Sequence, residues 1–347
     1  MNRRSVWAVA RWLGGAAIIA VVVWRLGTGP FLEGLRAVDG RSLALAAGIG
    51  FVTTACAAWR WNLVARGLGV ALPLPTATAA YYRSQFLNTV LPGGVLGDVD
   101  RAVRHGSEAG NVGRGVRAVA WERSAGQVVQ LVFGLLVLLL LPSRVPTWLL
   151  LVVAAVLVGV LGGGLLLRGR SPGGGSRGAR AFRAAASDLR HGLLARGAWP
   201  GITVASVVVV SGHLAILFVA ARTAGAVIPA VQLLPLAMLV LLATAVPTNI
   251  GGWGPREGVA AWAFGVAGLG AAQGVATTTV YAVLSLAVIA PAVPLLVVAW
   301  LRRRGSTITR LESAATITCP EPVEGRDVSL RPDLVPAMAQ PEGGGYG

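Results

Sequence analysis

The stretch WLLLVVAAVLVGVLGGGLLL, Trp148–Leu167, runs for twenty residues without a charged side chain. A helix of roughly 17–25 apolar residues is long enough to cross the hydrocarbon core of a bilayer. Seven other largely apolar runs lie on either side of it: Val6–Trp24, Ser42–Trp61, Gln127–Leu141, Pro200–Ala221, Val231–Val246, Gly258–Leu269 and Val275–Trp300. The pattern predicts an all-α polytopic membrane protein with about eight transmembrane segments. Gly258–Leu269 is short and rich in glycine, so the sequence does not decide whether this segment crosses the bilayer.

The composition of the whole chain agrees with a membrane protein. Of its 347 residues, 55% are hydrophobic and 13% are charged, about half the charged fraction of a typical soluble domain. The net charge is +16, and the arginines that carry it lie in short segments between the apolar runs. This placement is typical of a membrane surface and not of a nucleic-acid interface. Two cysteines and three histidines are too few for a disulfide framework or a metal cluster, so we expect no metal and no cofactor.

The placement of the arginines predicts the orientation of the chain. They cluster around the start of the first apolar run, in the segment Arg168–Trp199, and after the last run at Arg302–Arg304. Positively charged loops stay in the cytoplasm, so four crossings on each side of the middle cluster place both termini there. We therefore expect a multi-pass protein of the cell membrane. A cleavable signal at the N-terminus is the alternative, which is disfavoured because no A-x-A-like site follows Val23.

The composition changes at Gly305, after the last apolar run. The segment 305–347 is rich in Pro, Glu, Gly, Ser and Thr. A segment with so few apolar residues cannot offset the entropy lost on ordering. The sequence therefore predicts a transmembrane helical domain at residues 1–304 and a disordered tail at residues 305–347.

Two glycine-rich breaks interrupt the helical pattern, and the first is Thr76–Arg104. Its helical part, Thr76–Leu91, spans about 24 Å at 1.5 Å per residue, which is too short to cross the bilayer core. It ends at Leu91-Pro92-Gly93-Gly94, where proline disfavours helix at the preceding residue and glycine permits unusual backbone angles. Asp98 is then suited to the N-cap of a new helix and is spaced i, i+3 from Arg101.

The second break, Pro247–Glu257, has the same order of parts. A proline ends an apolar run, Asn249 follows, Gly251-Gly252 loosen the backbone, and a charged pair opens the next helix, with Pro255 suited to its first turn. Transporters often place binding sites at paired helices that glycine and proline interrupt. We therefore interpret the two breaks as corresponding, re-entrant elements of two structural repeats.

Backbone groups at such breaks need protein or water around them, because each unsatisfied group in lipid costs several kcal/mol. A helix that begins inside the membrane presents free amides, which favour an anion, and arginine binds a phosphate or carboxylate at two points. The breaks therefore predict a shared polar site that accepts an anionic headgroup. The alternative is a pair of ordinary loops at the water interface, in which the charged pairs are solvated.

A third polar element is Trp121–Gln127. Glu122, Gly126 and Gln130 lie at i, i+4 and i+8, which is one stripe of a helix. In this interpretation Glu122 points inward and positions an arginine, while Gly126 permits close packing and Gln130 bonds across it. The alternative for Glu122 is an interfacial pair with its neighbour. His213, within an apolar run, is expected to be a neutral histidine bonded to a neighbouring helix, with a proton relay as the alternative.

These elements give one predicted set of substrate-binding residues: Arg83, Asn88, Gly93, Gly94, Gly97, Asp98, Arg101, Glu122, Arg123, Asn249, Gly251, Gly252, Gly254, Arg256 and Glu257. Within the set, Arg83, Arg101 and Arg256 are expected to hold a phosphate. The three acids Asp98, Glu122 and Glu257 are expected to hold the arginines or to meet an ammonium group.

In order and spacing these motifs resemble the lysylphosphatidylglycerol synthase transmembrane-region family, also called flippase-like domain proteins. The family includes the membrane half of the bacterial multiple peptide resistance factor. Leu96 departs from its pattern, which more often has glycine there. The resemblance implies an integral membrane protein that binds and translocates an anionic or amino-acylated phospholipid, or another lipid-linked substrate, between leaflets. Its partners are then a membrane lipid and the bilayer, with no nucleic acid.

The resemblance also bears on catalysis. In the multiple peptide resistance factor, aminoacyl transfer resides in a large soluble domain, and residues 305–347 are too few for a domain of that kind. We therefore expect no synthase activity. The alternative is a membrane glycosyltransferase or aminoacyltransferase that acts on a lipid-linked substrate.

Overall fold

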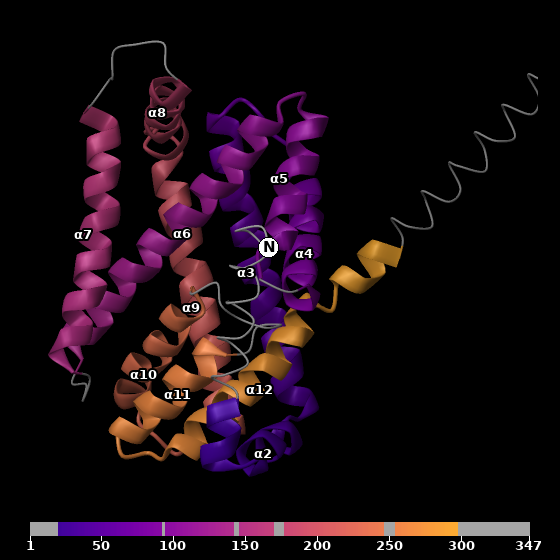
Figure 1. Ribbon diagram of the computed structural model, residues 1–347. Coiled ribbons are helices and arrows are strands. Elements are labelled where there is room, and N and C mark those ends of the chain that lie inside the picture. The colour runs from indigo at the N-terminus through magenta and orange to yellow at the C-terminus, as the bar shows by residue number, and fades with distance from the viewer. Residues whose placement is uncertain (1–19, 92–93, 142–145, 170–176, 246–253, 298–347) are drawn as a thin grey trace, which may run out of the picture. The chain divides into compact units, whose positions relative to one another are not determined.

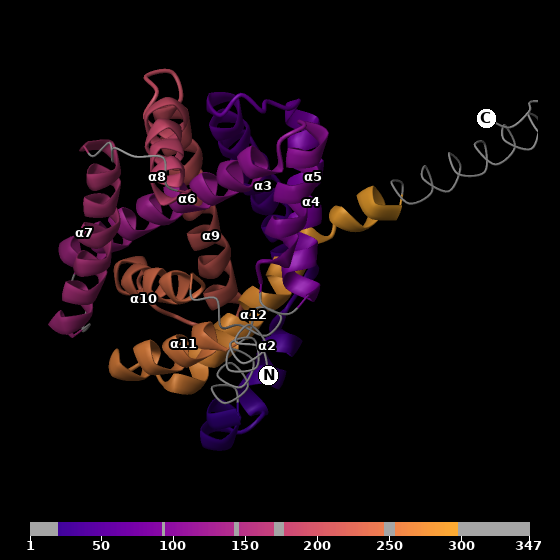
Figure 2. The ribbon, with the colours of Figure 1, turned by 45° about the horizontal axis from the view of Figure 1, so that its top comes forward.

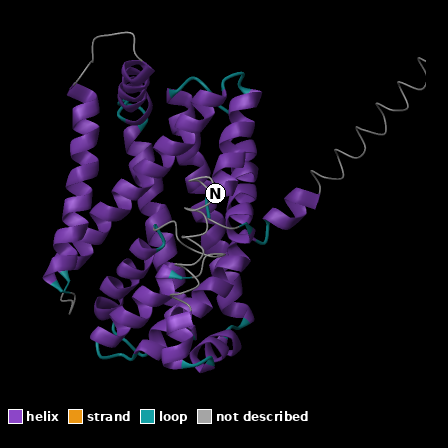
Figure 3. Cartoon of the chain, in the orientation of Figure 1, coloured by secondary structure: helices purple, strands orange, loops and turns teal. Residues whose placement is uncertain are grey.

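The computed structural model describes residues 20–91, 94–141, 146–169, 177–245 and 254–297. These residues belong to one compact unit, and the elements assigned among them are all helices (Figures 1 and 3). The helices are α2 (Gly29–Ala37), α3 (Gly40–Gly67), α4 (Leu74–Val90), α5 (Leu96–Glu108), α6 (Val112–Leu140), α7 (Thr147–Gly169), α8 (Arg177–Asp188), the π-helical turn η1 (Leu189–Leu193), α9 (Trp199–Thr223), α10 (Ala230–Ala243), α11 (Pro255–Val266) and α12 (Ala271–Ile289). The predicted all-α polytopic class is confirmed. The predicted tail lies outside the described residues.

Five of the described helices, α3, α6, α7, α9 and α12, are long and apolar enough to cross a membrane. They coincide with five of the eight predicted runs, while most of Val6–Trp24 lies outside the described residues. The remaining two runs correspond to α10 and α11, with 14 and 12 residues. At 1.5 Å per residue these helices are about 21 Å and 18 Å long, short of a bilayer core of about 30 Å. The total of eight crossings stays a prediction.

Helix α3 begins at a well-formed N-terminal cap. The carboxylate of Asp39 accepts a hydrogen bond from the Ser42 amide (2.8 Å), and the Ser42 hydroxyl reaches back to the Asp39 backbone. These contacts with Ser42 lower the pKa of Asp39, so the cap is made by the ionised carboxylate. The cap fixes where the 28-residue helix starts.

Helices α4 and α5 pack against each other as a first hairpin, residues 74–108. Its open end lies at the end of α3, where the Asn62 side chain donates to the Leu72 carbonyl (2.8 Å). Leu72 joins a buried cluster with Val64 of α3, Ala118 of α6 and Ile202 of α9. The other end of the hairpin carries Asn88, Thr89 and Gly94, which line a cavity.

Helices α10 and α11 pack as a second hairpin, residues 230–266. Leu233 near its start and Phe264 near its end share a buried cluster with Ala221 of α9 and Leu138 of α6. The residues at its tip, Ala243, Thr244 and Pro255, line the same cavity as the first hairpin. The run Val231–Val246, predicted as a span of its own, corresponds to the first helix of this hairpin, and its crossing stays a prediction.

The two hairpins lie with their open ends at opposite ends of the long helices α6 and α9 (Figures 1 and 2). Each of these long helices begins in the cluster at the open end of the first hairpin and ends in the cluster at the open end of the second. The members of the two clusters on α9, Ile202 and Ala221, are 221 − 202 = 19 residues apart, so the open ends are separated by about 28 Å, close to the thickness of a bilayer core. The two tips meet between them, at the cavity.

Two glycines allow the close packing at the hairpins. A Cβ atom on Gly97 of α5 would lie 2.0 Å from the Ser84 carbonyl oxygen of α4, and one on Gly274 of α12 would lie 2.4 Å from the Ala260 carbonyl oxygen of α11. Any larger residue would push the paired helices apart. Gly254, the residue that precedes α11, has φ +130°, a conformation that side chains other than glycine rarely adopt.

Candidate functional site

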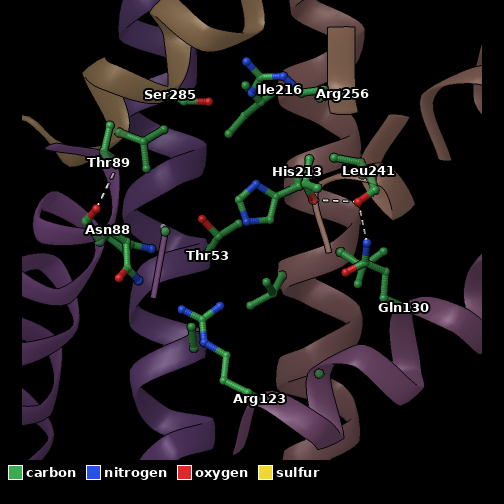
Figure 4. A pocket seen from close by; sticks show the side chains of 18 of the residues that line it. Thr53, Asn88, Thr89, Arg123, Gln130, His213, Ile216, Leu241, Arg256 and Ser285 are labelled. Carbon is green, nitrogen blue, oxygen red and sulfur yellow. Dashed lines mark hydrogen bonds between the residues drawn. The ribbon is translucent and has the colours of Figure 1, made fainter. Parts of the chain in front are cut away.

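A cavity of about 360 Å³ lies where the tips of the two hairpins meet. Its walls come from α3, α4, α6, α9, α10, α11 and α12, and Figure 4 shows the labelled side chains around it. The volume is within the range of small-molecule sites and is sufficient for a headgroup. Described residues of both predicted breaks, Gly94 of the first and Pro255 and Arg256 of the second, line this one cavity. That the cavity accepts an anionic headgroup stays a prediction.

Three arginines from three helices line the cavity: Arg60 of α3, Arg123 of α6 and Arg256 of α11. Among the described lining residues none is a carboxylate, and the undescribed residues of the two breaks contain no acid in their sequence. The uncharged polar side chains of the wall are Thr53, Tyr81, Gln85, Asn88, Thr89, Gln127, Gln130, His213, Thr244, Tyr281 and Ser285. The cavity therefore presents positive charge and hydrogen-bonding groups to its contents.

Glu122 lies behind the cavity lining and binds two arginines, Arg60 of the lining and Arg101 of α5. Its side chain is fully buried and accepts from the Arg60 Nε (2.9 Å), from the Arg60 Nη2, and from the Arg101 Nη2 (3.0 Å). The Tyr81 hydroxyl adds a longer bond to the same carboxylate (3.3 Å). A buried carboxylate is stabilised only when it is paired and hydrogen-bonded, and both conditions are met here. The inward orientation predicted for Glu122 is confirmed.

Asp98 joins the first hairpin to the same network. One of its oxygens accepts from the Ser84 hydroxyl (2.9 Å) and the Arg101 Nη2 (3.1 Å). The other accepts from the Asn88 amide (3.2 Å) and pairs with the Arg123 Nη2 (2.5 Å). The predicted i, i+3 pair of Asp98 and Arg101 is therefore present, and it is buried.

Asp98 does not occupy the N-cap position, so that prediction is wrong. Helix α5 begins at Leu96 after the cap residue Val95, which places Asp98 third in the helix. The free amide of Gly97 is satisfied by the Asn88 side-chain oxygen of α4 (2.8 Å). Because a neighbouring helix supplies the acceptor, the helix starts earlier and the Asp98 carboxylate remains available for the arginines.

Arg101 is bound by buried neighbours and does not line the cavity. Its guanidinium lies 4.5 Å from the centre of the Trp61 ring and 4.3 Å from that of Tyr81, and its side chain is 1% exposed. Stacking on two aromatic faces stabilises the charge on the sides where hydrogen bonds are missing. Trp61 is itself fully buried against this arginine.

The charged pair of the second hairpin is local. Glu257 accepts from the Arg256 Nη2 (2.7 Å) and Nε (2.9 Å), and its second oxygen accepts from the Gly254 amide (2.6 Å). Glu257 thus satisfies a free amide at the start of α11 with its own side chain, and Pro255 occupies the first turn as predicted. Arg256 also lies over the Tyr281 ring at 5.2 Å.

The structure separates the predicted site residues into three groups. Asn88, Gly94, Arg123 and Arg256 line the cavity. Gly97, Asp98, Arg101, Glu122, Gly254 and Glu257 form or adjoin the buried support described above. Gly93, Asn249, Gly251 and Gly252 lie outside the described residues.

Arg83 is the described member of the set that neither lines the cavity nor joins this support. It pairs with Asp100 (3.1 Å), and both side chains are more than a quarter exposed. Asp100 also meets Arg104 (3.5 Å). Of the three arginines expected to hold a phosphate, Arg256 lines the cavity, together with Arg60 and Arg123, whereas Arg83 and Arg101 do not line it.

The sequence interpretation missed Arg60, Tyr281 and the cavity position of His213. Arg60 has the Trp59–Trp61 setting of an interfacial anchor, although α3 continues for seven more residues to Gly67. Gly126, predicted to permit close packing, accommodates the Arg60 guanidinium, because a Cβ atom there would lie 2.8 Å from the Nη1. Gln130, the next residue of the same stripe, donates to the Leu241 carbonyl (2.9 Å), as predicted for a bond across helices.

The fold and the cavity define a multi-pass helical membrane protein with a polar cavity at the tips of two helical hairpins. Residues 11–292 match the family described as the lysylphosphatidylglycerol synthase TM region. The match covers most of the chain, so the chain belongs to this family, as its motifs indicated. The family places it among membrane proteins related to lipid handling. No curated protein and no solved structure matches the chain.

Proposed function

We propose that the protein binds the phosphate of an anionic phospholipid in the cavity and moves that lipid between leaflets. The observation that carries the proposal is the lining of three arginines and no described carboxylate at the meeting point of two hairpins. Arginine matches the geometry of a phosphate with two parallel hydrogen bonds. Family membership supports a lipid as the source of that phosphate.

The charge of the site supports a single anionic group. Arg60, Arg101 and Arg123 face two acids, Asp98 and Glu122, while Arg256 and Glu257 neutralise each other. Four arginines against three carboxylates leave 4 − 3 = +1. A phosphodiester carries one negative charge, so its binding would neutralise the site at little net electrostatic cost.

The placement of the hairpins supports movement between leaflets. Their open ends lie at opposite ends of the bundle and their tips meet at the cavity. A headgroup bound in the cavity lies between the two ends of the bundle, while the acyl chains of the lipid remain in the bilayer. Only the headgroup therefore has to be desolvated. Paired broken helices around a central site are the arrangement found in many transporters.

The test is lipid movement in vesicles that contain the purified full chain. We expect acyl-labelled phosphatidylglycerol to exchange between leaflets, and acyl-labelled phosphatidylcholine, whose choline adds a positive charge, to exchange much less. Arg123→Gln should reduce the exchange of phosphatidylglycerol at least about tenfold, the value of one charge-assisted hydrogen bond. Arg114→Ala is the matched control, because Arg114 is an exposed arginine of the same helix outside the cavity lining.

Equal exchange by the native chain and by Arg123→Gln would overturn the proposal. The rival, a transferase that acts on a lipid-linked substrate, predicts instead that the purified chain turns over a labelled donor. In that case product would form with the native chain, and lipid exchange would be absent.

A further inference from the structure

Among the described residues that line the cavity, His213 of α9 is the one histidine. Histidine is the side chain whose ordinary change of charge falls closest to neutral pH. Figure 4 shows the ring of His213 projecting into the cavity between Arg256 on one side and Arg123 on the other. The Nδ1 atom lies 3.2 Å from the Tyr281 hydroxyl of α12. An ionisable residue inside a membrane bundle is a candidate functional group, because burying it there is costly.

The Tyr281 hydroxyl can serve both protonation states of this histidine. It can donate to Nδ1 of a neutral ring, and it can accept from the Nδ1–H of a protonated ring. The contact therefore holds the ring in place without fixing its charge. Tyr281 also carries Arg256 over its ring, so histidine, tyrosine and the arginine of the second hairpin are in consecutive contact.

The charged groups that share the described cavity lining with His213 are all cations. They are Arg60 of α3, Arg123 of α6 and Arg256 of α11, and the lining also carries Tyr81 of α4 and Tyr281 of α12. Behind them lie Glu122 of α6 and Glu257 of α11, while α10 carries no ionisable side chain. Both carboxylates in this set are bound to arginines, which leaves the net charge of +1 derived above. A positive charge on His213 is therefore opposed by burial and by the arginines while the cavity is empty, and a bound anion offsets the part that comes from the arginines.

We propose that His213 takes up a proton when the headgroup binds, which makes the protein a proton-coupled carrier of anionic lipid. The step is the addition of one proton from the aqueous phase to the imidazole, which becomes imidazolium, and the proton leaves when the anion leaves. By linkage, the proton strengthens anion binding by the same factor with which the anion strengthens proton binding. This inference rests on the proposed function and adds its coupling ion.

The experiment measures the affinity of the purified full chain for phosphatidylglycerol in detergent at pH 5.5, 6.5 and 7.5. The phosphodiester keeps its single charge over this range, so the lipid itself contributes no pH dependence. We expect the native affinity to rise about tenfold from pH 7.5 to pH 5.5, within the usual range of coupling between two sites. A pH indicator in weak buffer should report proton uptake when the lipid is added at neutral pH.

Two variants separate His213 from the rest of the chain. His213→Gln keeps a side chain that can bond to Tyr281, and it should bind the lipid with no pH dependence and no proton uptake. His105→Gln is the control, since His105 of α5 packs edge-on against Trp61 outside the cavity lining and should leave both signals unchanged. Thermal unfolding of each variant checks that it is folded.

The outcomes distinguish this proposal from the one on which it rests. A native chain that binds phosphatidylglycerol equally at all three pH values overturns proton coupling and leaves the anion site standing. His213→Gln with the native pH dependence also overturns it, because the proton would then bind elsewhere. Absence of lipid binding at every pH overturns the proposed function itself.

Discussion

The two hairpins have the same plan but differ in how their acids are used. In the first, Asp98 has four partners that come from α4, α5 and α6, and Glu122 extends the contacts to α3. In the second, Glu257 binds the adjacent Arg256 and the amide of Gly254, all within the start of one helix. Both acids occupy the third position of the helix that leaves the tip.

This difference indicates a division of work. The acid of the first hairpin fixes the arginines of several helices and so builds a wall of the cavity. The acid of the second hairpin fixes only its own arginine, so the second tip brings one charge to the cavity without being bonded through it to the first. Loss of the acid in the first network should therefore destabilise the fold more than loss of the acid in the second.

The largest effect is expected for Glu122→Ala. The substitution leaves Arg60 and Arg101 buried without their shared carboxylate, and removing one partner of a buried ion pair costs about 3–5 kcal/mol. Glu257→Ala removes one arginine partner and one amide acceptor, for which we expect about 1–3 kcal/mol. The measurement is the free energy of unfolding of both variants in mixed micelles. Equal losses would contradict the inference that the network around Asp98 and Glu122 stabilises more of the fold than the pair of Arg256 and Glu257.

The next effect is steric and concerns the packing of the first hairpin. Gly97→Ala places a Cβ atom 2.0 Å from the Ser84 carbonyl, and relief of such an overlap costs about 1–3 kcal/mol. Gly48→Ala in α3 is the control, because a Cβ atom there meets nothing within 4 Å. The control should be neutral or stabilising in the same unfolding assay, and a Gly97→Ala chain as stable as the native one would show that α4 and α5 are not tightly packed.

The sequence predicted those parts of the molecule that depend on neighbouring residues. Long apolar runs define spans, proline and glycine define breaks, and the spacing of Asp98 and Arg101 places them together on one helix. The orientation of Glu122 also followed from a helical stripe. These features are local, so the periodicity of a helix is enough to find them.

The parts that the sequence did not reveal depend on contacts between distant segments. Arg60 and Glu122 are separated by 62 residues, and no spacing rule relates them. Asp98 was expected at an N-cap because the acceptor that replaces it, Asn88, belongs to another helix. The sequence also does not show which arginines are bound to carboxylates. Arg83 is bound to Asp100, and Arg101 to Asp98 and Glu122, and neither arginine lines the cavity.

The third prediction compares the cavity arginines of the two hairpin regions. Arg123→Gln and Arg256→Gln should each weaken binding of phosphatidylglycerol at least about tenfold, or ~1.4 kcal/mol, because each removes a charged donor. Their effects on stability should differ. Asp98 keeps three partners when Arg123 is changed, whereas buried Glu257 loses the one arginine that it binds among the described residues, so the melting temperature should fall further for Arg256→Gln. The reverse order of melting temperatures would contradict the assignment of their partners.

The smallest effect is expected for Arg83→Gln, which tests whether the first hairpin has an outer charge pair separate from the site. Arg83 and Asp100 are 28% and 30% exposed, and pairs of this kind contribute about 0–1 kcal/mol because water and salt screen them. Asp100 retains Arg104 in the variant. Phosphatidylglycerol affinity should remain within about twofold of the native value, since Arg83 is not part of the cavity lining. A tenfold loss of affinity would show that Arg83 contributes to lipid binding. The binding site would then extend along the outer face of the first hairpin when lipid is bound.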